Sequence, residues 1–167
     1  NITLYDGEAS FMYNDTVKVA HDKKEILLQG KEIFINTGST PILPDVEGLN
    51  ESKHAFTSET LLRQSVLPKH LLILGAGTIG MDGTPYFLEG DALLLATGRR
   101  AMTDGLNLHA AGVQTDAQGA IVVNGHLQTT SPHIWAMGDV RGGAMYDYLS
   151  IDDFRIITNH LFGNKKR

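Results

Sequence analysis

Thr130–Gly143 decides the fold of this chain and reads Thr-Ser-Pro-His-Ile-Trp-Ala-Met-Gly-Asp-Val-Arg-Gly-Gly. An apolar run, Ile134–Met137, leads directly into Gly138 and Asp139, and an amphipathic segment begins at about Tyr146. This order predicts a strand, a carboxylate on a tight turn and then a helix. A glycine lets the backbone approach a bound group, and an aspartate at the carboxyl end of a strand can accept hydrogen bonds from a sugar-like hydroxyl. The stretch therefore predicts a site for a polyol-bearing cofactor, and the alternative is a plain turn that caps a helix.

The composition narrows the classes of protein that this chain can represent. Its 167 residues suffice for one core or two small ones, and a net charge of -5 argues against a nucleic-acid partner. The apolar runs fall far short of the roughly 20 residues that a membrane span needs. The amino terminus lacks the basic and then apolar pattern of a signal peptide, so we expect a cytoplasmic protein. With no cysteine, this chain cannot form a disulfide or a thiolate zinc site, and its seven histidines show no metal-ligand spacing.

The remaining pattern predicts short strands, one short helix and one long helix. A small antiparallel meander is expected within residues 2–35, followed by a turn over Asn36–Pro44. The other expected elements are a short helix capped by Thr57 or Ser58, buried strands at His70–Leu74 and Asp91–Ala96, two or three short strands around Val113, Ala120–Val123 and Leu127, and a helix over Tyr146–Phe162 with Gly163 as its C-cap.

A glycine-rich stretch, Gly75–Gly80, follows the strand at His70–Leu74. A strand that leads into G-x-G-x-x-G is the dinucleotide fingerprint, in which backbone amides approach a pyrophosphate. Here the expected helix is interrupted by the glycine and the proline of Met81–Pro85, and no acidic residue ends the next strand. A dinucleotide-binding half also needs more residues than the ten before Asp91.

We infer a discontinuity at or close to Gly80 and Met81, relative to the natural parent of this chain. Either most of the nicotinamide domain has been deleted, or the residues at that point are not represented in the sequence. A naturally shortened loop that keeps only the glycine turn is the competing explanation.

Two segments form a faint internal repeat. Ile33–Ser39 and Asp91–Arg99 each consist of an apolar strand followed by a Thr-Gly turn. Such a pair arises where each of two nucleotide-binding halves ends in a strand and a glycine turn that crosses to the other half.

Four motifs in this order closely resemble those of the flavoprotein pyridine nucleotide-disulfide oxidoreductases: Asn36–Pro41, Gly75–Gly80, Ala96–Arg99 and Gly138-Asp139. Within that family, the chain looks most like the mercuric-reductase-like and reactive-chlorine-resistance branch. The resemblance implies an α/β fold, namely a partial Rossmann-like FAD-binding domain of the three-layer ββα type with a small antiparallel meander. Residues 1–66 and 98–167 would form this domain, and residues 67–97 would be a remnant of the NAD(P)-binding domain.

The resemblance also implies which residues bind cofactors. Asp139 would hold the ribityl chain of FAD, and the start of the following helix would lie against the flavin. The implied FAD-binding residues are Gly138, Asp139, Thr37, Gly38, Ala9, Met145, Tyr146 and Asp147, and those on the NAD(P) side are Gly75, Gly77, Gly80 and Gly98. Many relatives carry Leu-Ala-His where this chain has Tyr146-Asp147-Tyr148.

The implied activity of the parent protein is electron transfer from NAD(P)H through FAD to a disulfide or another small-molecule acceptor, in a homodimer. The family's first FAD glycine loop would precede Asn1, its dimerisation domain would follow Arg167, and its cysteine pair is absent from these residues. We therefore expect this chain alone to be inactive as a disulfide reductase, and we assign no catalytic residue. The alternatives are a non-catalytic remnant or binding module without a cofactor, and a plain NAD(P)-binding Rossmann module.

Overall fold

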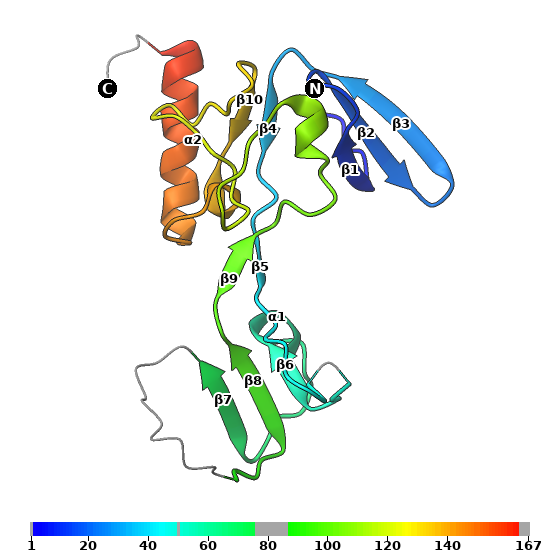
Figure 1. Cartoon of the computed structure of the whole chain (residues 1–167), viewed down its shortest axis with the longest axis vertical. Coiled ribbons are helices and arrows are strands. Elements are labelled where there is room, and N and C mark those ends of the chain that lie inside the picture. Colours follow the sequence, from blue (N-terminus) through cyan, green and yellow to red (C-terminus); the bar gives the residue numbers. More distant parts are fainter. Residues whose placement is uncertain (1, 50, 76–86, 164–167) are drawn as a thin grey trace. The chain divides into compact units, whose positions relative to one another are not determined.

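Two strands from distant parts of the sequence pair at the centre of the first of two compact units in the chain. The computed structural model describes residues 2–49, 51–75 and 87–163 (Figure 1). The first unit consists of Asn1–Thr40 with Arg100–Arg167, and the second consists of Pro41–Arg99. The α/β class expected from the sequence is confirmed by mixed parallel and antiparallel strands with helices.

The central strands are β4 (Ile33–Ile35) and β10 (Ile134–Ala136), which run parallel, with Phe34 opposite Trp135. Ile134 and Ala136 are fully buried in one apolar cluster, whereas Trp135 joins a second cluster with Ile157 of α2 (Asp147–Phe162). Successive side chains of a strand point to opposite faces, so β10 is buried on both faces. This double burial explains why its sequence is continuously apolar.

The antiparallel meander is confirmed in the first unit. It comprises β1 (Glu8–Phe11), β2 (Thr16–His21) and β3 (Lys24–Gln29), paired in sequence order. The strands begin at Glu8, later than the expected range of residues 2–35, because Ile2–Leu4 have no strand partner and the side chains of Ile2 and Leu4 are exposed.

The short strands expected around Val113, Ala120–Val123 and Leu127 are also wrong. The segment instead holds a 3₁₀ turn, η1 (Leu108–Ala111), and isolated bridges of Thr115 with Ile121 and of Gln128 with Trp135. The carboxylate of Asp116 accepts hydrogen bonds from the backbone N–H groups of Gln118 and Ala120. Such local bonds compete with a strand ladder, while the apolar side chains still enter the core.

The second unit contains a parallel sheet in the order β6-β8-β7, formed by β6 (Ala55–Thr57), β8 (Ala92–Ala96) and β7 (Leu71–Gly75). The short helix is confirmed as α1 (Ser58–Leu61), with the Thr57 hydroxyl accepting a hydrogen bond from the Thr60 N–H at its start. The second unit includes residues 41–66, because β6 pairs with β8.

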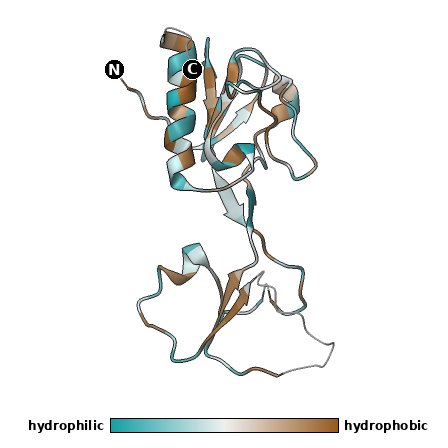
Figure 2. Cartoon of the chain, turned by 90° about the vertical axis from the view of Figure 1, so that its left-hand side faces the viewer, coloured by the Kyte–Doolittle hydropathy of each residue, from teal (hydrophilic) through white to brown (hydrophobic). Residues whose placement is uncertain are grey.

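Strand β7 is not buried, contrary to the sequence prediction. Ile73 is 65% exposed and Leu74 is 42% exposed, although β7 and β8 are both hydrophobic, as Figure 2 shows. The strand lies at the edge of its sheet, and no described residue covers its faces enough to bury it. None of the helices within the described ranges is both long and apolar enough to cross a membrane.

Replacing Ile134 with alanine tests the central position of β10. Ile134 is fully buried, so Ile134→Ala should lower the free energy of unfolding of the first unit by about 2–5 kcal/mol. Ile151→Ala is the matched control, because Ile151 is 56% exposed on α2 and its loss should change stability by only about 0.5 kcal/mol. Urea denaturation followed by fluorescence reports on this unit, since its buried Trp135 is the single tryptophan of the chain. Equal losses for the two variants would contradict this description of the core.

Candidate functional site

The candidate site begins where β10 ends. Met137 is extended, and the next four residues form a 3₁₀ turn, η2 (Gly138–Arg141). Asp139 is half-buried in this turn, and the Ser39 hydroxyl donates a hydrogen bond of 2.6 Å to its Oδ2 atom. The predicted order of strand, carboxylate turn and helix is therefore correct.

The second carboxylate oxygen of Asp139 is free to accept a hydrogen bond. No hydrogen bond within the described residues reaches Oδ1, and every buried side-chain nitrogen or oxygen among them has a partner. Oδ1 must therefore be accessible to solvent. An accessible carboxylate oxygen is a strong acceptor for a ligand hydroxyl.

Gly138 is required by its surroundings. Its φ is +71°, and an added Cβ atom would lie 2.8 Å from Asn36 Oδ1 and 3.0 Å from Ser150 Oγ. Any larger residue would combine backbone strain with two close contacts. The glycine therefore allows β4, the turn and α2 to approach one another.

A partly buried ion pair lies beneath the turn. Asp153 of α2 is 2% exposed, and its Oδ2 accepts hydrogen bonds from Gly138 N at 2.8 Å and Arg141 Nε at 2.6 Å. Its Oδ1 accepts a third bond, from Arg141 Nη2, at 2.9 Å. Sequence reasoning missed this residue, although its position gave a signal. Asp153 lies four residues from both Leu149 and Ile157, so it falls on the inward stripe of the helix.

The two Thr-Gly turns of the internal repeat have the same pattern of hydrogen-bond donors and acceptors, each within its own unit. Thr37 Oγ1 donates to the Met102 carbonyl oxygen at 2.7 Å, and Met102 N donates to the Gly38 carbonyl oxygen at 2.9 Å. In the second unit, Thr97 Oγ1 donates to the Ile42 carbonyl oxygen at 2.6 Å, and Ile42 N donates to the Gly98 carbonyl oxygen at 2.9 Å.

Both turns lead into extended chain. Gly38 and Gly98 have φ values of +75° and +109°. The strands that follow, β5 (Ser39–Pro41) and β9 (Arg99–Ala101), pair with each other. The sequence predicted a turn over the whole of Asn36–Pro44, which is wrong for β5 because a strand partner is present there.

The structure brings only some of the expected site residues together. Gly138, Asp139 and the Thr37-Gly38-Ser39 segment meet through the bond from Ser39 to Asp139. Ala9 is exposed on β1 opposite Val19. No hydrogen bond among the described residues connects it to Asp139.

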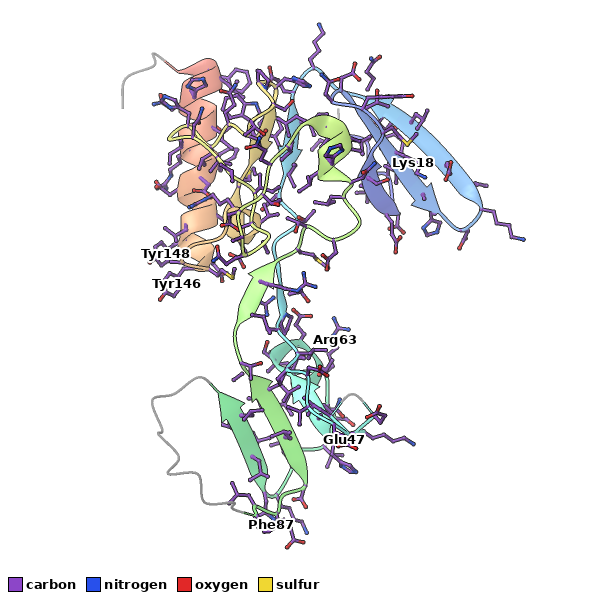
Figure 3. All side chains as sticks on the ribbon, viewed as in Figure 1. Lys18, Glu47, Arg63, Phe87, Tyr146 and Tyr148 are labelled. Atoms are coloured by element: carbon purple, nitrogen blue, oxygen red, sulfur yellow. The ribbon has the colours of Figure 1, made fainter. Side chains whose placement is uncertain are left out.

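The residues at the start of α2 have different environments. Met145 is half-buried, and Asp147 is exposed as the first residue of the helix. Tyr146 and Tyr148 are exposed and stack with ring centroids 5.4 Å apart, at the end of α2 where the helix begins (Figure 3).

Two of the residues expected on the NAD(P) side, Gly75 and Gly98, are described by the structure and belong to the second unit. Gly75 ends β7, and a Cβ atom added there would make only ordinary contacts with Ala96. Gly98 has the positive φ described above. Gly77 and Gly80 lie outside the described residues, as does the discontinuity inferred at Gly80 and Met81.

The two arginines after Gly98 are each paired with a carboxylate. Arg99 Nη2 lies 3.0 Å from Glu59 Oε1, and Arg100 Nη2 lies 2.5 Å from Asp104 Oδ2. The hydrogen bond from Arg100 lowers the pKa of the Asp104 carboxyl group below its usual value. Among the described residues, no group of three or more histidine, cysteine, aspartate or glutamate side chains could hold a metal ion.

Comparison with known proteins gives a consistent match. A family model described as pyridine nucleotide-disulphide oxidoreductase matches residues 1–89 and 81–153. The probable pyridine nucleotide-disulfide oxidoreductase RclA of Escherichia coli is 30% identical over 230 residues, covering 100% of this chain and 52% of the relative. A mercuric reductase of Lysinibacillus sphaericus is 30% identical over 235 residues, covering 99% of this chain and 42% of the relative.

A solved structure also matches the chain. The HOCl-induced flavoprotein disulfide reductase RclA from Escherichia coli superposes with a TM-score of 0.88 at 28% identity, covering 98% of this chain and 51% of that protein. The chain thus spans about half the length of the curated relatives that it matches.

Replacing Gly138 with alanine tests the packing of the turn. Gly105→Ala is the matched control, because Gly105 has a φ of +76° but no atom within 4 Å of an added Cβ. The control should lose about 1–2 kcal/mol from backbone strain alone. Gly138→Ala should lose about 1–3 kcal/mol more, because of the contacts with Asn36 and Ser150. Denaturation midpoints measure the difference, and equal losses would show that the turn has room for a side chain.

Proposed function

Because this chain belongs to the pyridine nucleotide-disulphide oxidoreductase family, we propose that it forms part of an FAD-dependent enzyme that passes electrons from NAD(P)H to an acceptor. The observation that carries this proposal is the Asp139 carboxylate at the end of β10. One of its oxygens is held by Ser39, and the other is accessible to a ligand hydroxyl.

The residues around Asp139 fit the ribityl chain of FAD. A polyol presents hydroxyl donors, and an ionised carboxylate accepts hydrogen bonds without a donor of its own to satisfy. Gly38 adds a second suitable feature, because no atom lies within 4 Å of an added Cβ and its backbone is therefore open to a ligand. Bound FAD would supply the redox chemistry, accepting hydride from NAD(P)H and returning two electrons to the acceptor.

The chain's own residues would then bind and orient the cofactor. Asp139 would accept a hydrogen bond from a ribityl hydroxyl, and Thr37 and Gly38 would border the same ligand. The positive end of the α2 dipole would favour negative charge on the reduced flavin. Gly75, Gly77, Gly80 and Gly98 would serve the nicotinamide nucleotide.

The lengths of the matches support an interrupted nicotinamide domain. The alignment with the Escherichia coli relative extends over 230 positions, although this chain has 167 residues. The relative therefore carries residues that have no counterpart here. The family match is divided into two parts that overlap at residues 81–89, beside Gly80 and Met81.

The finer parts of the proposal concern the whole protein. Its acceptor would be a disulfide or another small molecule, it would act in the cytoplasm, and it would form a homodimer. The relatives are named as disulfide oxidoreductases and mercuric reductases, which supports a redox acceptor.

A non-catalytic remnant without a cofactor is the second candidate function. The exposed apolar side chains of β7 favour it, since Ile73 is 65% exposed in a parallel sheet, a kind of sheet that is normally buried on both faces. Flavin content separates the two candidates. Protein expressed from its own gene should be yellow or take up added FAD if it is a flavoenzyme, and it should remain colourless if it is a remnant.

Replacing Asp139 tests the proposed role directly. A hydrogen bond to a charged group contributes roughly 1.5–3 kcal/mol, so Asp139→Ala should weaken FAD binding about 10- to 100-fold. Asp152→Ala is the control, because Asp152 is exposed on α2 and its side chain forms no hydrogen bond or ion pair with another described residue. Titration of the apoprotein with FAD measures both affinities. If Asp139→Ala binds FAD as tightly as the wild type does, Asp139 is not the residue that holds the ribityl chain.

A further inference from the structure

We propose that Asp153 and Arg141 form a positioning pair, which holds the turn of Asp139 in the conformation that points its free carboxylate oxygen at the ligand. This inference rests on the proposed function of Asp139. Neither member of the pair needs to touch the ligand, because each acts through the backbone of the turn.

The Asp153 carboxylate forms hydrogen bonds with residues at both ends of the η2 turn. It accepts a hydrogen bond from the backbone of Gly138, the first residue of η2, and two from the side chain of Arg141, the last residue. Asp139 lies between these two anchors. A fourth bond, from Gly142 N to the Asp139 carbonyl oxygen at 2.9 Å, closes the turn itself.

The side chain of Asp139 is therefore constrained from two directions. The anchors at Gly138 and Arg141 fix the direction in which its Cα–Cβ bond leaves the backbone. Ser39 then binds Oδ2 and so determines which oxygen faces the ligand. Loss of the anchors would leave the Ser39 bond as the only restraint on the carboxylate within the described residues.

Stability alone does not explain an ion pair at this place. Replacing a buried ion pair with apolar residues is often neutral or stabilising, because burial removes both charges from water. The next inward position of α2 is Ile157, which packs with Trp135 in an apolar cluster. The polar pair instead satisfies the buried N–H of Gly138 and sets the geometry of the turn.

Arg141 has a separate part in this arrangement. It forms a two-pronged pair with Asp153, using Nε and Nη2, and its side chain is 24% exposed. A guanidinium group holds a carboxylate in a fixed plane, which an ammonium group does less well. Arg141 also balances the charge of Asp153 next to the turn that carries a second carboxylate, Asp139.

The experiment compares FAD affinity with stability in the protein expressed from its own gene. The test variant is Asp153→Asn, which leaves Arg141 without a carboxylate. The matched control is Ile157→Ala, which removes a buried side chain from the same helix without touching the turn. Urea denaturation ranks their stability, and titration with FAD, at a temperature where all variants are folded, gives their affinities.

A positioning role predicts separate effects in the two measurements. Both variants should unfold at lower urea concentration than the wild type. Only Asp153→Asn should bind FAD about tenfold more weakly, by analogy with residues that orient metal ligands. The absorption spectrum of its bound flavin should also change, whereas that of Ile157→Ala should match the wild type. Equal loss of affinity in the two variants, or none in Asp153→Asn, would overturn the positioning role.

A second pair of variants keeps the test decisive if Asp153→Asn does not fold. Arg141→Met removes the charge and the donors, whereas Arg141→Lys keeps the charge and one donor nitrogen while Asp153 stays intact. Affinity should fall in Arg141→Met and return in part in Arg141→Lys. Equal affinities for these two and the wild type would contradict the proposal. If the wild type binds no FAD, or if Asp139→Ala binds it normally, the proposed function itself fails and the positioning role fails with it.

Discussion

The parallel pairing of β4 with β10 is the interaction on which the first unit depends. It brings the end of one strand, followed by Asn36–Ser39, beside the end of another, followed by Gly138-Asp139. Parallel strands end at the same edge of a sheet, so both polar turns emerge together. The apolar clusters on the two faces of β10 hold this edge in place. The candidate site is thus a direct product of strand order.

Local signals were enough to predict the parts of this structure that depend on neighbouring residues. The glycine before Asp139 and the helical spacing after Tyr146 are local, and both elements are present. Contacts across the sequence could not be read in this way. The bond between Ser39 and Asp139 joins residues that are 100 positions apart, and nothing in either motif specifies it. The prediction that β7 is buried failed for the same reason, because an apolar strand is buried only where another element covers it.

The sequence analysis also missed the role of Asp153. The sequence places Asp153 on the inward stripe of α2, but a single acidic residue in such a stripe is compatible with several interpretations. Only the structure shows that its partners are Arg141 and a backbone N–H from the turn before the helix. The strands expected around Val113 and Ala120–Val123 failed because the Asp116 carboxylate ties nearby backbone groups into a local turn. In both places a buried or local carboxylate decided the conformation.

The pairing of β5 with β9 has a consequence for how this protein can change over evolution. These strands are the points at which the chain leaves the first unit and returns to it, and they lie side by side. A segment whose two ends are adjacent can be lengthened or shortened without moving the core that hosts it, as in inserted domains generally. The second unit can therefore differ in length from that of the relatives while β4, β10 and α2 keep their fold. The pairing of β5 with β9 makes the two units separable modules for natural selection.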